Sequence, residues 1–172
     1  KDSENPHHVR SDAFWGITFP GYDFLCWNTK QDGTGTEYKI GDELTPTADV
    51  TLYAQWTRTI TFNDNLGSST PTTQKITVGS PTNLTPNGFS YTDDTKSFVG
   101  WTTSATDKTI EYKDGSSVTL TGDDATDITN LYAQWGIPCT VHFKANYPEG
   151  ATGTSGSMND LVVGKGFKTP IN

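Results

Sequence analysis

The chain has few of the residues that build redox, metal or catalytic centres. It contains two cysteines and three histidines in 172 residues. Cys26 and Cys139 are too far apart in sequence to form a CxxC redox or zinc motif. His7 and His8 lie in a polar leader and His142 in an expected strand, and no pair has the spacing of a metal-binding motif. We therefore expect no metal, no cofactor and no cofactor-binding residue.

Hydrolase motifs and long hydrophobic runs are also missing. Serine and threonine are abundant, but no Gly-x-Ser-x-Gly elbow occurs. The acid pairs Asp93/Asp94 and Asp123/Asp124 lie in turn-like segments without the apolar neighbours that would raise one pKa. No apolar run approaches the roughly 18 residues needed to cross a bilayer. The chain is expected to be neither an enzyme nor inserted in a membrane, and no catalytic residue is assigned.

Basic residues are scarce. Twelve Lys and Arg stand against twenty Asp and Glu, for a net charge of −8. Without a basic patch this charge repels the phosphates of nucleic acids, so we exclude them as partners. The first residues, Lys1–Glu4, do not resemble a signal peptide, and we expect any export signal to lie outside this sequence.

What the chain does contain is an internal repeat. The segment Leu52–Trp56 recurs unchanged as Leu131–Trp135, and Phe24–Thr29 corresponds to Phe98–Thr103. The spacing from Trp27 to Tyr38 equals that from Trp101 to Tyr112. Repetition at a fixed period is typical of tandem arrays.

A third, partial copy follows. Residues 60–62 and 76–79 resemble residues 141–143 and 161–164. We therefore divide the chain into residues 1–56, the back half of a repeat with an unmatched leader at 1–12; residues 57–135, a complete repeat; and residues 136–172, the front half of a further repeat. The terminal halves are expected to complete one another, in cis or in trans, so a homodimer is a candidate assembly.

The pattern within each copy favours strands. Val50–Trp56 alternates apolar and polar residues, with Gln55 and Tyr53 on the polar side. Short runs rich in Thr and aromatic residues alternate with Gly, Pro, Asn and Asp turns, and helix signals are weak. The fold class is mainly β, α+β at most, with short strands and little helix. The expected repeat core consists of Phe24, Trp27, Leu52, Trp56, Ile60, Phe62, Phe98, Trp101, Leu131 and Trp135.

These ordered motifs resemble the Listeria–Bacteroides repeat, which includes the B repeat of internalin B. The resemblance rests on Gly21, Tyr22, Phe24, Trp27, Tyr38, Gly41 and Asp49 to Trp56, and on Phe98, Trp101, Tyr112, Gly115 and Asp127 to Trp135. It implies small β-grasp-like domains in tandem on exported bacterial surface proteins. The chain departs from the pattern at Cys26, which stands where the family usually has glycine.

The two cysteines occupy repeat positions that bear on each other. Cys26 stands at the place of Gly100, and Cys139 at the place of Arg58. If residues 137–172 fold against residues 1–56, the two sulfur atoms could come within bonding distance. The alternative is two unrelated buried thiols.

The expected function is structural: a stalk or spacer of a cell-surface or secreted protein, with possible adhesion to a host, matrix or envelope protein or glycan. Only Thr57 and Arg58 separate Trp56 from the next expected strand, which predicts restricted bending between copies. The alternative function is an accessory glycan- or protein-binding module of a larger extracellular enzyme or adhesin, with Trp15 as the candidate ligand contact. Calcium at Asp32–Gly35 and a Lys–Asn crosslink are alternatives that stay open.

Overall fold

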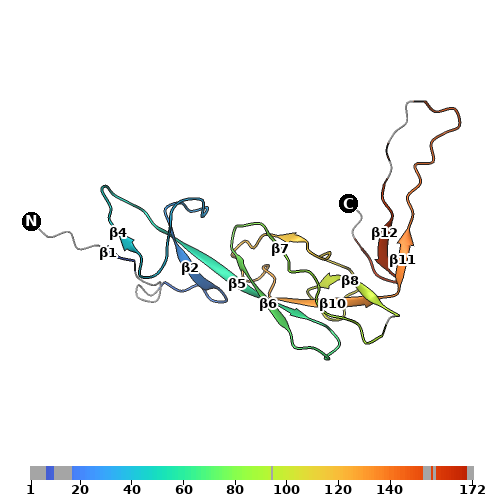
Figure 1. Cartoon of the computed structure of the whole chain (residues 1–172), viewed down its shortest axis with the longest axis horizontal. Helices are drawn as coiled ribbons and strands as arrows, with labels where there is room; N and C mark the ends of the chain where they lie inside the picture. The colour runs from blue at the N-terminus through green and yellow to red at the C-terminus, as the bar shows by residue number, and fades with distance from the viewer. Residues whose placement is uncertain (1–6, 10–16, 94, 153–155, 157, 170–172) are drawn as a thin grey trace, which may run out of the picture. The chain divides into compact units, whose positions relative to one another are not determined.

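The computed structural model describes residues 7–9, 17–93, 95–152, 156 and 158–169. Within these residues the chain forms strands and no helix, so the prediction of a mainly β fold is confirmed (Figure 1). The β-grasp-like arrangement stays a prediction. The strands are β1 (His7–His8), β2 (Asp23–Asn28), β3 (Glu37–Tyr38), β4 (Glu43–Leu44), β5 (Tyr53–Asn63), β6 (Thr72–Thr77), β7 (Thr82–Asn83), β8 (Ser97–Thr102), β9 (Ser117–Val118), β10 (Asn130–Gly136), β11 (Pro138–Val141) and β12 (Leu161–Gly164).

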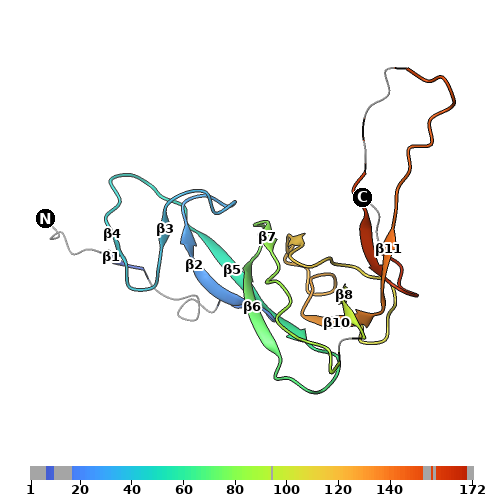
Figure 2. The ribbon, with the colours of Figure 1, turned by 45° about the vertical axis from the view of Figure 1, so that its right-hand side comes forward.

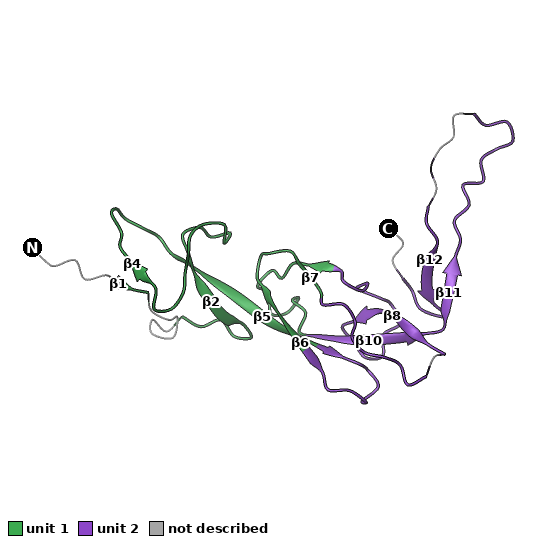
Figure 3. Ribbon diagram, viewed as in Figure 1, with its two compact units in different colours: residues 1–61, 73–84, 117–129 green, residues 62–72, 85–116, 130–172 purple. Residues whose placement is uncertain are grey.

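The chain divides into two compact units, coloured separately in Figure 3. Unit 1 contains residues 1–61, 73–84 and 117–129. In this unit β2 pairs antiparallel with β3 and with β5, β6 also pairs with β5, and two short pairs, β1–β4 and β7–β9, lie outside that sheet. The buried apolar residues of unit 1 are Val9, Tyr22, Cys26, Ile60, Ile76, Leu84, Val118, Leu120 and Ile128.

Unit 2 contains residues 62–72, 85–116 and 130–172. Its central pair is β8 with β10, and the hairpin of β11 and β12 contacts both of these strands (Figure 2). A parallel bridge joins Thr109 to Lys168. The buried apolar residues of unit 2 are Phe62, Trp101, Ile110, Leu131 and Ala133.

The two sequence copies pair their strands in the same register. In unit 1 Phe24 lies opposite Trp56 and Trp27 opposite Ala54. In unit 2 the equivalent partners are Phe98 with Trp135 and Trp101 with Ala133. Trp27 also pairs with Tyr38, and Trp101 with Tyr112. The repeat seen in the sequence is therefore a repeat of strand pairing.

The predicted core residues are buried or half-buried in both copies. Ile60, Phe62, Trp101 and Leu131 are buried, whereas the other six are half-buried. The six half-buried residues are Phe24, Trp27, Leu52, Trp56, Phe98 and Trp135.

The aromatic rings of this core meet edge to face, apart from the tilted pair of Phe24 and Trp27, and edge-to-face contact adds about 0.5–1.5 kcal/mol per pair beyond area burial. The Phe24 ring lies 5.4 Å from Trp27 and 5.8 Å from Trp56. The corresponding distances from Phe98 are 4.9 Å to Trp101 and 5.9 Å to Trp135. Each copy is thus organised around one Phe and two Trp rings.

The closing strand differs from its predicted pattern. Strand β5 begins at Tyr53, and Val50 is 43% exposed. Gln55, expected on the solvent side, is buried because its amide donates to the carbonyl oxygen of Gln31 at 3.3 Å. Gln134 is buried in the same way, donating to Thr102 Oγ1 at 2.8 Å. A buried amide is tolerated where its hydrogen bonds are satisfied.

The exchange of glycine for Cys26 has a steric explanation. Gly100 has φ +141°, and a Cβ there would collide with Ile110 and lie 2.9 Å from the Tyr112 carbonyl oxygen. In the first copy Thr36 stands at the place of Ile110. Cys26 is buried but does not have a positive φ, so the first copy does not impose there the backbone conformation that favours glycine at position 100.

Part of the leader belongs to the repeat. Strand β1 pairs with β4 as β7 pairs with β9, and β4 and β9 follow Gly41 and Gly115 at equal distance. His7 and His8 are therefore the first-copy counterpart of β7. This similarity is invisible in the sequence because only the backbone pairing recurs.

The compact units do not follow the repeat boundaries. The complete copy, residues 57–135, contributes to both units, and strand β5 contains both the closing run of one copy and the opening run of the next. The hairpin of residues 138–164 belongs to unit 2. That residues 136–172 complete residues 1–56 stays a prediction.

Candidate functional site

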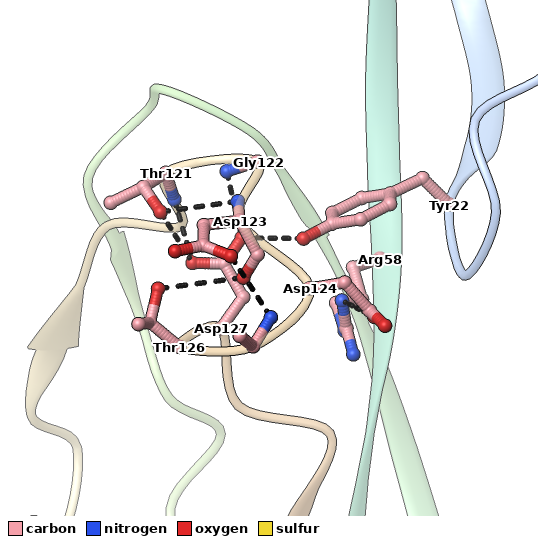
Figure 4. Close-up of polar contacts among 9 residues, drawn as sticks. Tyr22, Arg58, Thr121, Gly122, Asp123, Asp124, Thr126 and Asp127 are labelled. Atoms are coloured by element: carbon pink, nitrogen blue, oxygen red, sulfur yellow. Dashed lines mark hydrogen bonds and ion pairs between the residues drawn. The ribbon is translucent and has the colours of Figure 1, made fainter.

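The most connected polar site in unit 1 is the acidic turn of residues 121–127, which includes the residues that lengthen the second copy (Figure 4). Asp127 is its centre. Its Oδ1 accepts hydrogen bonds from the Thr121 backbone N–H at 2.7 Å and hydroxyl at 3.1 Å. Its Oδ2 accepts from the Gly122 N–H and from the Tyr22 hydroxyl, both at 2.8 Å. One carboxylate thus closes the turn and ties it to Tyr22.

A second acid in the turn reaches strand β5. Asp124 Oδ1 lies 2.7 Å from Arg58 Nη1, and the Arg58 side chain is only 5% exposed. The N–H directions are not aligned for a hydrogen bond, so the contact is an ion pair. The guanidinium carbon also lies 4.8 Å from the centre of the Tyr22 ring, a cation–π distance. Arg58 is therefore held by the Asp124 carboxylate and by the aromatic ring of Tyr22.

The protonation states follow from these contacts. Burial alone would raise the pKa of Asp127, but the hydrogen bonds from Thr121, Tyr22 and Gly122 outweigh it and hold the pKa below 3.8. Burial and the bond to Asp127 raise the pKa of Tyr22. For Arg58, burial opposes the charged form, yet Asp124 and Tyr22 together raise its pKa. At neutral pH Asp127 and Arg58 are therefore charged, and Tyr22 keeps the proton that it donates to Asp127.

An apolar contact supports the same turn. The rings of Phe19 and Tyr22 stack with centroids 4.0 Å apart, and Phe19 meets Trp56 edge-on at 5.5 Å. Gly122 has φ +84°, and a Cβ there would lie 3.5 Å from Val78 and 3.6 Å from Phe19. The turn therefore needs glycine for its backbone and is packed against aromatic and aliphatic side chains.

We call the turn of residues 121–127, together with Tyr22 and Arg58, the clasp of unit 1, because its polar side chains hold the turn in place. Both carboxylate oxygens of Asp127 accept hydrogen bonds, from the turn and from Tyr22. Asp123 Oδ1 accepts a hydrogen bond from the Ala125 N–H, and Asp124 forms the ion pair with Arg58. No three His, Cys, Asp or Glu side chains converge as metal ligands in the described part of the chain. Asp127 thus has both oxygens in hydrogen bonds within unit 1, whereas the Asp124 side chain is 68% exposed beside Arg58.

Unit 2 has a comparable carboxylate at Asp64, after strand β5. It is 4% exposed and accepts five hydrogen bonds from Leu66, Gly67, Ser68 and Ser69. Burial alone would raise the pKa of Asp64, but these bonds hold it well below its usual range. The indole N–H of Trp135 donates to the Asp64 carbonyl oxygen at 2.7 Å. This loop fixes the end of β5 against the aromatic core.

The residues singled out as candidate sites are placed as follows. Cys26 is buried and Cys139 half-buried, and both are free thiols, so a bridge stays a prediction. Trp15 lies outside the described residues. Asp32 Oδ1 accepts two hydrogen bonds from Thr34, at 3.0 and 2.8 Å, which accounts for that turn without an ion. His142 Nδ1 lies 2.8 Å from Asp160.

The sequence alone does not predict this site. Tyr22 and Asp127 are repeat motifs in the sequence, and the pair Asp123/Asp124 reads there as solvated charge. The available signal was that Gly122 and the extra acids interrupt an otherwise matching segment of the second copy. Nothing in the sequence connected that insertion with Tyr22 and Arg58.

Comparison with known proteins places these motifs in a family. The model of the Listeria–Bacteroides repeat domain matches residues 16–55 and 59–134. A protein of Evansella cellulosilytica, named as a Gly-rich membrane protein, is 32% identical over 140 residues, which is 73% of this chain and 15% of that protein. No solved structure matches the chain. Within the described residues, no helix has the length and apolar character needed to span a membrane.

Proposed function

Because the chain belongs to the Listeria–Bacteroides repeat family, we propose that it is a non-catalytic stalk or spacer segment of a bacterial cell-surface or secreted protein. The observation that carries the proposal is the shared register of the two copies together with strand β5. That strand contains the end of one copy and the start of the next, with no linker residues between them. A spacer needs this property because a flexible linker would let its ends approach.

The polar sites support the same function. Asp127, Asp124 and Asp64 are each occupied by hydrogen bonds or an ion pair that fix loops to strands. An array of small units gains stability mainly from such local and neighbouring contacts. The relative named as a membrane protein is consistent with a place at the cell envelope.

A glycan-binding module is the second candidate, and the described residues favour it less. Sugar platforms need exposed flat rings, whereas Trp27, Trp56 and Trp135 are half-buried and Trp101 is buried. Each of these four rings has a place in the repeated core. We therefore propose adhesion only as a second function, after the spacer function, and expect its partner to be a host, matrix or envelope protein.

Small-angle X-ray scattering of the 172-residue chain tests the spacer proposal. The expected result is a single set of interatomic distances, unchanged between low and high salt. The control is the same chain unfolded in urea, which gives the broad distance distribution of a flexible chain. If the native chain instead gives a broad distribution that changes with salt, it bends freely and the spacer proposal is wrong.

A further inference from the structure

Unit 2 contains the only Asn-Gly pair of the sequence, Asn87–Gly88, directly before Phe89. Asn87 is half-buried, and Gly88 is exposed. The Asn87 Oδ1 accepts a hydrogen bond from the Phe89 backbone N–H at 3.0 Å, and the Asn87 Nδ2 donates to the Phe89 carbonyl oxygen at 3.0 Å. These two bonds close a turn around Gly88 and fix the orientation of the side-chain amide.

We propose that Asn87 is a site of spontaneous deamidation, and that the modification loosens unit 2. The Gly88 N–H first gives its proton to a base in the solvent. A bond then forms between the Gly88 nitrogen and Asn87 Cγ, the Cγ–Nδ2 bond breaks, and the amide leaves as ammonia. Water opens the resulting succinimide ring at either carbonyl, which yields an aspartate or an isoaspartate linkage. This reaction needs only water and does not depend on the spacer function.

Gly88 is suited to be the attacking residue. It has no side chain to crowd the Cγ atom that its nitrogen has to reach, and a Cβ at this position would have no atom within 4 Å, so the ring has open space. Among the described residues, the Gly88 N–H has no hydrogen-bond partner. Its proton is therefore available to solvent.

The hydrogen bonds of Asn87 act on different steps of the reaction. Negative charge develops on Oδ1 as the nitrogen attacks, so the bond from the Phe89 N–H strengthens at this point. The bond from Nδ2 to the Phe89 carbonyl oxygen opposes the reaction, since it is lost when ammonia leaves. It joins two neutral groups beside an exposed glycine, where water can replace it.

The turn positions an aromatic ring of the core. The Phe89 ring meets Trp101, which is 1% exposed, edge-on at 6.3 Å. After deamidation to aspartate, residue 87 no longer donates to the Phe89 carbonyl oxygen, because a carboxylate only accepts hydrogen bonds. The isoaspartate product also adds a methylene group to the backbone before Phe89. Both products therefore loosen the contact of Phe89 with Trp101.

A second carboxylate lies beside the same turn. The Asn87 N–H donates to Asp114 Oδ1 at 2.7 Å, and Asp114 is exposed. Deamidation therefore adds a negative charge next to an existing one, in a chain whose net charge is already −8. Like charges near the surface repel more strongly at low salt. We expect the loss of stability to be larger at low ionic strength.

Intact mass and peptide mapping of the 172-residue chain, incubated in its folded state at mildly alkaline pH, test the proposed site. The mass is expected to rise by the difference between OH and NH₂, and mapping to place the change at Asn87 as aspartate and isoaspartate. The matched control is Gly88→Ala. Gly88 has no positive φ and has space for a Cβ, so this variant keeps the turn. It is expected to lose its amide several-fold more slowly.

A second sample, unfolded in urea, sets the length of the incubation. Incubation continues until this unfolded chain has lost the Asn87 amide. If the folded chain still keeps its amide at that time, the turn protects Asn87 and the proposal is overturned. A Gly88→Ala variant that reacts as fast as the native chain would equally overturn it.

Asn87→Asp imitates the aspartate product and tests the consequence by itself. Urea unfolding followed by tryptophan fluorescence is expected to show a lower midpoint than for the native chain, with a larger difference at low salt than at high salt. The uncharged Gly88→Ala variant is expected to show no such dependence on salt. If Asn87→Asp is as stable as the native chain at low salt, the modification does not loosen unit 2 and that part of the proposal is overturned.

Discussion

Replacing Asp64 by asparagine is expected to destabilise unit 2 strongly. The Asp64 Oδ1 accepts from the backbone N–H groups of Leu66 and Gly67, at 2.9 and 3.0 Å. Its Oδ2 accepts from the Ser68 N–H, the Ser68 hydroxyl and the Ser69 N–H, at 3.0, 2.8 and 2.7 Å. All five groups are donors. An asparagine amide has only one oxygen, so its NH₂ has to face donors on one side.

The magnitude follows from the donors left unpaired. With the amide oxygen toward Ser68 and Ser69, the N–H groups of Leu66 and Gly67 lose their acceptor. Each unsatisfied buried donor costs about 1–3 kcal/mol, which gives about 2–6 kcal/mol for two fully buried donors. Because Leu66 is only half-buried and Gly67 is exposed, the expected loss lies in the lower part of this range, roughly 2–4 kcal/mol. This is a large share of the roughly 5–15 kcal/mol by which a domain is stable.

Urea unfolding followed by tryptophan fluorescence measures the effect, since Trp135 donates to the Asp64 carbonyl oxygen and reports on this loop. The control is Asp93→Asn, because Asp93 is exposed and, among the described residues, accepts hydrogen bonds from the N–H and hydroxyl of Thr95 alone. It is expected to cost under about 0.5 kcal/mol. An Asp64→Asn variant as stable as this control would refute the reasoning.

The same carboxylate predicts a pH dependence. The folded pKa of Asp64 is lower than its ordinary value of 3.8, so the unfolded chain binds the proton first. The stabilisation is fully present above that value and is lost as the pH falls through it toward the folded pKa. The difference in stability between the native chain and Asp64→Asn is therefore expected to shrink below about pH 4. A difference that stays constant down to pH 2 would contradict this assignment.

Three further predictions concern other contacts. Gly100→Ala is expected to lower the free energy of unfolding by about 1–3 kcal/mol from overpacking alone, and adding Ile110→Thr, which imitates the first copy, should recover part of it in the same urea titration. Asp127→Asn should cost roughly 1–3 kcal/mol by thermal unfolding at pH 7, because the amide loses an acceptor for the turn or for its tyrosine partner. Because Cys26 and Cys139 are free thiols in the structure, alkylation in denaturant without reductant is expected to add two labels to the intact mass, whereas a mass without labels would support a bridge.

The repeated aromatic positions were readable from the sequence because a core has to recur in every copy. Phe24, Trp27 and Trp56 recur as Phe98, Trp101 and Trp135, and both sets are covered from solvent in the same register. The mainly β class followed from alternation and turn residues. Alternation and turn residues are local features of the sequence, so they can be read without knowledge of long-range contacts.

The clasp of unit 1 was not predictable in this way. Asp127 and Tyr22 are 105 residues apart in sequence, and Arg58 and Asp124 belong to different runs. Alternation places Gln55 on the face opposite to Ala54 and Trp56, but it does not predict that this side chain is buried. The Gln55 amide donates to the carbonyl oxygen of Gln31, which is 24 residues away in sequence.

The sequence by itself determined the repeat, its family pattern, the mainly β class and the residues of the aromatic core, because these depend on composition, spacing and period. Only the tertiary structure decided that the complete copy contributes to two compact units, that the carboxylates of Asp127 and Asp64 hold loops through their hydrogen bonds, and that Asp124 pairs with Arg58. The physical reason is that burial and hydrogen bonding depend on which distant segments meet. A carboxylate in a turn has the same local sequence whether it is solvated or accepts five hydrogen bonds.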